Sequence, residues 1–73
     1  VTIPGSVNEI GDNAFGDCKS LESVNIQKGV KRIGRHAFSD CSSLVSVTIP
    51  RNIKEISASA FDNCESLEEV IEI

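Results

Sequence analysis

A 23-residue period runs through the whole chain and constrains the fold more than any other feature. Aligned at this period, the 73 residues form three complete copies, 1–23, 24–46 and 47–69, and residues 70–73 begin a fourth. Eight columns are apolar in every copy, and they hold 24 of the 29 apolar residues. Such sorting is typical of a solenoid, in which each coil buries its apolar face only against its neighbours. We therefore predict one domain, 1–73, of three stacked coils that forms part of a longer solenoid.

The apolar spacing changes within each copy and predicts more than one kind of segment. In the third copy Val47 and Ile49 alternate with Thr48, which indicates a short strand with Thr48 facing outward. Pro50 ends that strand because proline has no N–H to donate to a ladder. A second extended segment is expected over residues 53–56. Stacked coils then give a parallel β-ladder along one side of the solenoid.

A short helix is predicted on the opposite side of each coil. In the third copy its apolar positions are spaced one, four and seven residues from the first, a helical face of about two turns. These positions are Ala60, Phe61, Cys64 and Leu67. Gly11, Gly34 and Ser57 precede this segment, where a turn or an N-cap is expected. The predicted fold class is therefore an α/β solenoid with strands on one side and short helices on the other.

The third copy closely resembles a known repeat. From Leu44 to Leu67 it reads Leu-x-x-Val-x-Ile-Pro-x-x-Ile-x-x-Ile-x-x-x-Ala-Phe-x-x-Cys-x-x-Leu, and this run resembles the BspA-type leucine-rich repeat of bacterial and some protozoan surface proteins. The Ala-Phe pair followed by Cys and Leu is the specific part, and it occurs three times at constant phase. Two positions depart from the pattern. Gln27 replaces a proline, and Glu72 replaces the isoleucine expected in the fourth strand, which is therefore out of register or frayed.

The resemblance implies a secreted or cell-surface protein, often called an adhesin, that contacts host, matrix or neighbouring-cell molecules. Leucine-rich solenoids usually bind partners on the open face of the sheet. The outward strand residues predicted to line that face are Thr2, Ser23, Asn25, Ser46, Thr48, Glu69 and Ile71. We interpret the face as a shallow polar platform for a protein or a glycan, although small polar and β-branched residues also suit an exposed sheet with no partner.

Catalytic and cofactor chemistry is not expected. The three cysteines occupy one apolar column, so we expect buried free thiols. A disulfide between adjacent coils is the alternative, and it would leave one thiol over. A metal site is not expected, because metal ligands converge on one point whereas these cysteines are stacked in a line. His36 is the only histidine and occupies a variable polar column, so no Ser/His/Asp set can be assembled. We predict neither an enzyme nor a cofactor or metal site.

Charge excludes one class of partner and suggests how the coils are held in register. The net charge of −4 argues against nucleic-acid binding, and no apolar run is long enough to insert into a membrane. Glu9, Arg32 and Glu55 share a column, so adjacent coils alternate in sign. The second copy also carries a basic cluster, and the third ends in an acidic one. These clusters are the basic residues Lys28, Lys31, Arg32 and Arg35, and the acidic residues Asp62, Glu65, Glu68, Glu69 and Glu72.

An alternative function is structural. Neither end of the chain resembles a polar cap, so about eight apolar positions are expected to be exposed at each end. End-to-end stacking of copies would bury these positions and propagate as a filament. The joint would place Glu55 over Glu9 and Glu68 over Glu22, which disfavours it. A spacer or self-associating unit is therefore the alternative to a binding module.

Overall fold

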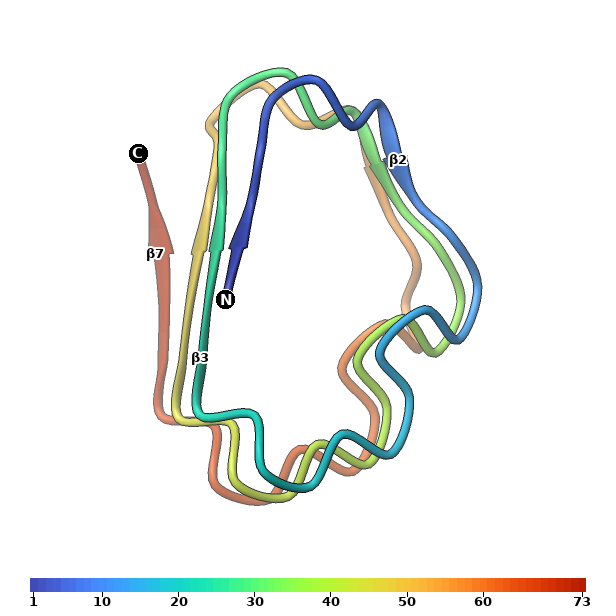
Figure 1. The fold of residues 1–73 in the computed structure, drawn as a ribbon, viewed down its shortest axis with the longest axis vertical. Coiled ribbons are helices and arrows are strands. Elements are labelled where there is room, and N and C mark those ends of the chain that lie inside the picture. The colour runs from blue at the N-terminus through green and yellow to red at the C-terminus, as the bar shows by residue number, and fades with distance from the viewer.

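The computed structural model describes all 73 residues as a solenoid of three coils. Figure 1 looks along the stack, so that the coils lie one behind another around a common core. Each coil contributes one strand to each of two separate ladders. The strands are β1 (Thr2–Ile3), β2 (Glu9–Ile10), β3 (Ser23–Ile26), β4 (Arg32–Ile33), β5 (Ser46–Ile49), β6 (Glu55–Ile56) and β7 (Glu69–Glu72).

Both ladders are parallel, and both pair residues that lie one repeat apart in the sequence. The first sheet has the order β1-β3-β5-β7, and the second has the order β2-β4-β6. Val24 pairs with Val47, for example, and Ile10 pairs with Ile33. These ladders confirm the predicted solenoid, the strand side and the second extended segment.

The fourth strand, β7, continues the first sheet in register. Ile49 pairs with Glu72 and Val47 pairs with Val70. Beyond Glu72, the backbone N–H of Ile73 donates to the carbonyl of Ile49 at 3.0 Å. Backbone hydrogen bonds therefore hold Glu72 in the sheet at a position where the earlier strands have isoleucine. The side chain of Glu72 is exposed.

The middle coil forms the centre of the hydrophobic core. Its members of the eight apolar columns are all at most 2% exposed, because a coil covers them on both sides. They are Val24, Ile26, Val30, Ile33, Ala37, Phe38, Cys41 and Leu44. In the outer coils, by contrast, several positions of these columns are only partly buried. The core is thus ordered by coil, and the middle coil contributes most to it.

The predicted helices are absent, which is a correction to the expected α/β class. Residues 12–17, 35–40 and 58–63, which include the start of each expected helical face, form continuous turns. Two residues in the first of these segments, Asn13 and Asp17, have φ near +60°. Left-handed backbone interrupts a right-handed α-helix, and Asn and Asp adopt it most readily among non-glycine residues.

Hydrogen bonds between coils explain why turns replace the helix. The backbone N–H groups of Asn13, Phe15 and Asp17 donate to carbonyls of the next coil, at 2.7–2.9 Å. In an α-helix that begins at Gly11, the N–H groups of Phe15 and Asp17 would instead donate to the carbonyls four residues earlier. Gly11 and Gly34 begin the turn segments, as expected, but they open β-turns and no helix follows.

A stack of three phenylalanine rings fills the turn side of the core. The ring centroids of Phe15 and Phe38 are 5.1 Å apart, and those of Phe38 and Phe61 are 5.2 Å apart. The rings are within 4° of parallel in both pairs. Phe38 therefore has an aromatic neighbour on each of its two faces.

Candidate functional site

The seven residues predicted to line a binding face lie together on the outer surface of the first sheet. One row crosses all four strands of the sheet, because its members are paired across β1, β3, β5 and β7. It consists of Thr2, Asn25, Thr48 and Ile71. A second row, of Ser23, Ser46 and Glu69, crosses the three longer strands. Neighbouring members of a row are about 4.8 Å apart, the spacing of strands in a sheet.

This sheet face is polar and open. All seven side chains are exposed or half-buried, while Val24, Ile26 and Val47 of the same strands point into the core. Hydroxyls and one carboxamide make up most of the face; Glu69 adds a charge and Ile71, 40% exposed, an apolar side chain, both at the β7 edge. Such a surface can donate and accept hydrogen bonds in a regular array, but it offers a partner little apolar area to bury.

The second sheet carries the alternating charges predicted from the sequence. Arg32 Nε donates to Glu55 Oε1 at 3.1 Å, and a terminal nitrogen of Arg32 bonds to Glu9. These two carboxylates raise the pKa of Arg32, and the largest cause is the hydrogen bond that Arg32 donates to Glu9. Beside them, Asp12 accepts a hydrogen bond from the backbone N–H of Arg35 at 2.8 Å. Charge on this face is therefore paired between coils and keeps adjacent coils in register.

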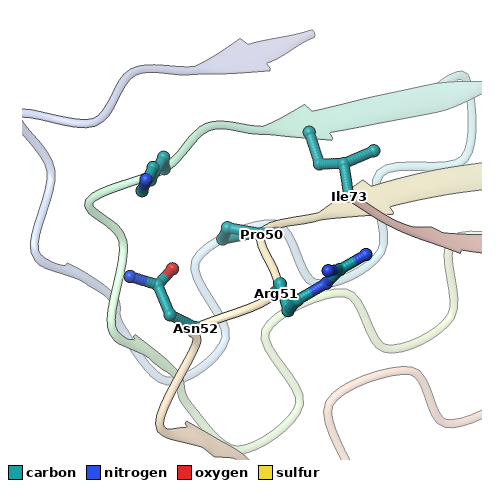
Figure 2. A pocket seen from close by; sticks show the side chains of 5 residues that line it. Pro50, Arg51, Asn52 and Ile73 are labelled. Carbon is teal, nitrogen blue, oxygen red and sulfur yellow. The ribbon is translucent and has the colours of Figure 1, made fainter.

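A hollow beside the first sheet was not anticipated from the sequence. It has a volume of about 460 Å³ and lies where the chain leaves β5 (Figure 2). Its lining consists of Lys28, Pro50, Arg51, Asn52 and Ile73. Lys28 and Arg51 occupy the same column of the repeat, and this shared column was the available signal in the sequence. Only the fold shows that they line a hollow together with Ile73.

The cysteines form a column of free thiols. Cys41 is buried as expected, whereas Cys18 and Cys64 are only partly buried because they lie in the outer coils. Cys41 Sγ donates to the carbonyl of Phe15 at 3.2 Å, and Cys64 Sγ donates to the carbonyl of Phe38 at 3.0 Å. Burial is the main cause that raises the pKa of Cys41 and of Cys64 above 9.0, the ordinary value. The thiols of Cys41 and Cys64 thus each donate to a carbonyl of the preceding coil, which is a structural role.

Thiol reactivity should follow this burial. Cys41 is fully buried, so we expect it to react with a disulfide reagent far more slowly in the folded protein than in guanidinium chloride. In the denatured chain all three thiols should react. The rate of the folded protein should rise with pH, because only the thiolate reacts and a raised pKa reduces its fraction at neutral pH. Single-cysteine variants that keep Cys41 or Cys18 provide the comparison. Fewer than three thiols in the denatured chain would contradict the free-thiol assignment.

No other cluster suggests chemistry. His36 is exposed, has a φ of +53° and lies 3.9 Å from Asp62 through Nδ1. The structure holds no group of three or more histidine, cysteine and acidic side chains that could coordinate a metal ion. It also has no helix that could cross a membrane.

The repeat geometry agrees with a family found by comparison with known proteins. The model of the BspA type leucine rich repeat region (6 copies) matches residues 1–72. The chain belongs to this family. Membership confirms the resemblance carried by the Ala-Phe-x-x-Cys-x-x-Leu run, and the BspA-type coils of this chain close with turns and not helices. Neither the curated proteins nor the solved structures contain a match to the chain.

Proposed function

We propose that this BspA-type segment is a non-catalytic binding module of a secreted or cell-surface protein, and that it contacts a protein or glycan through the outer face of its first sheet. The observation that carries the proposal is the pair of polar rows across β1, β3, β5 and β7. The solenoid core covers only the other side of these strands, which leaves the rows free to meet a partner.

Family membership supports the location and the class of partner. Proteins with BspA-type repeats are often secreted or displayed on the surface, and leucine-rich repeats often bind proteins. The absence of aromatic side chains from the face indicates a contact based on hydrogen bonds, with modest affinity for one segment. Repetition along a longer solenoid would add further contacts of the same kind.

The sheet-face proposal is tested by Asn25→Arg combined with Thr48→Arg. Two large cations in the centre of the first row should abolish binding to any ligand found on a panel of purified matrix proteins or a glycan array. Ala58→Arg with Asn8→Arg is the matched control, because it adds the same charge at exposed positions outside the first sheet. Unchanged affinity of the Asn25→Arg/Thr48→Arg variant would move the site off this face.

End-to-end self-association is the second candidate function, favoured by apolar side chains exposed at both ends, Val1 and Val70 among them. The position of β7 opposes it. The first sheet has four strands and the second has three, so β1 of a second copy would have to displace β7 before its second ladder could meet β6. A single small species in size-exclusion chromatography and electron microscopy would support the binding module over the filament.

A further inference from the structure

Four cations lie on the turns that join the first sheet to the second, and we call this set the basic corner. It consists of Lys28, Lys31, Arg51 and Lys54. All four side chains are exposed. Lys28 and Arg51 are one repeat apart, as are Lys31 and Lys54, so the two turns bring them together on adjacent coils about 4.8 Å apart. The backbone bond from Lys54 N–H to the carbonyl of Lys31, at 2.9 Å, places the second pair directly in register.

The basic corner departs from the charge pattern of the rest of the solenoid. On the second sheet each stacked pair is of opposite sign, as in Glu9 with Arg32. At the corner the stacked pairs are of like sign, and none of its four cations takes part in any of the ion pairs within the chain. Like charges in register oppose coil stacking. The corner therefore does not help to align the coils, and its charge is available to a ligand.

The hollow described above adjoins this charge and adds a second kind of contact. Lys28 and Arg51 line it together with the carboxamide of Asn52, and Ile73 contributes an apolar side chain (Figure 2). A ligand that fits must combine negative charge with apolar groups and with hydrogen-bonding groups for Asn52.

The charge of the remaining surface selects among anionic ligands. The chain has eleven acidic and seven basic residues, and four of the seven basic residues are in the basic corner. A long polyanion such as a nucleic acid or a sulfated glycan would extend beyond the corner onto strongly acidic surface and be repelled there. A short acidic peptide carries a few carboxylates, apolar side chains and backbone amides within the reach of the corner and hollow.

We propose that the basic corner binds an acidic segment of a partner protein, with carboxylates paired to the four cations and an apolar side chain in the hollow. This surface is separate from the sheet face proposed above. Contact by both surfaces would let a partner cover the sheet and extend around its edge. Because the corner is exposed, the interaction should be salt-dependent and should depend on charge more than on sequence.

The test is fluorescence anisotropy with a labelled peptide of six glutamates and two leucines. We expect Lys28→Glu with Arg51→Glu to weaken binding by about tenfold or more at low salt, and raising the salt to about 0.2 M to weaken binding to the unsubstituted chain. Lys19→Glu with Arg35→Glu changes the net charge equally outside the corner, so it should have a much smaller effect. Circular dichroism confirms that each variant is folded, and Lys31→Glu with Lys54→Glu repeats the test at the other pair.

The remaining outcomes separate this proposal from its alternatives. Equal loss in the Lys19→Glu/Arg35→Glu variant would overturn it, since net charge and not the corner would then govern binding. Tighter binding of a heparin fragment or a single-stranded oligonucleotide than of the peptide would also overturn it, as would equal binding of a peptide with glutamine in place of glutamate. The Asn25→Arg/Thr48→Arg variant should bind the peptide at least as well as the unsubstituted chain, so failure of the sheet-face proposal leaves this result unaffected.

Discussion

Phe38→Ala should destabilise the chain by about 3–5 kcal/mol. The Phe38 ring is fully buried and stacked between Phe15 and Phe61. Its removal takes away both stacking contacts and leaves a cavity in the middle coil, which alone has neighbours on both sides. A domain of this size has a total unfolding free energy of about 4–10 kcal/mol, so the loss is a large part of it. Urea denaturation followed by circular dichroism measures the effect.

Phe61→Ala is the matched control for that prediction. Phe61 is only partly buried and stacks with a single ring, so about half the loss of stability is expected. Equal effects of the two substitutions would mean that the coils do not differ in their contribution to the core. A loss below about 1 kcal/mol for Phe38→Ala would contradict the packing described here.

Gly29→Ala should destabilise the chain by about 3 kcal/mol, through backbone strain and overlap together. Gly29 has a φ of +118°, a region that residues with a Cβ rarely adopt. A Cβ there would also overlap the carbonyl oxygen of Gly5 on the adjacent coil, and that atom belongs to the backbone and cannot rotate away. The midpoint of thermal unfolding is the measurement.

Gly11→Ala provides the control for Gly29→Ala. A Cβ at Gly11 has no atom within 4 Å and its φ is not in the positive region. That substitution should leave stability unchanged or raise it by less than about 1 kcal/mol, because alanine reduces the entropy of the unfolded chain. If both substitutions had the same effect, the close approach of Gly5 and Gly29 would not limit how the coils stack.

Much of the solenoid was predictable because the 23-residue repeat determines the register of strand pairing between adjacent coils. Residues one period apart pair in both ladders, so a column of identical character in the sequence becomes a row on the surface or a line in the core. The seven sheet-face residues lie in two rows across the first sheet for this reason. Glu9, Arg32 and Glu55 were also predicted as a column of alternating charge, and the structure pairs them as expected.

The predicted helices were wrong because apolar spacing does not distinguish a helix from a series of turns with the same inward face. A signal against the helix was present. Asp17, Asp40 and Asn63 recur in one column and all have φ near +60°. Short polar residues that tolerate left-handed backbone mark a place where a helix cannot continue. Bonds from this segment to the next coil then replace the bonds within a helix.

The sequence by itself determined the period, most members of the core, the register of the coils and the rows of the sheet face. Val1, Ala14 and Ile56 belong to the apolar columns but are exposed, because they lie in the outer coils. Only the tertiary structure decided which charged side chains form ion pairs and which do not. The cluster predicted along the second copy divides in space: Arg32 pairs with acids on the second sheet, whereas Lys28 and Lys31 join Arg51 and Lys54 of the next coil. The physical reason is that charges interact across the 4.8 Å between coils, and closure of each coil determines which residues lie across that gap.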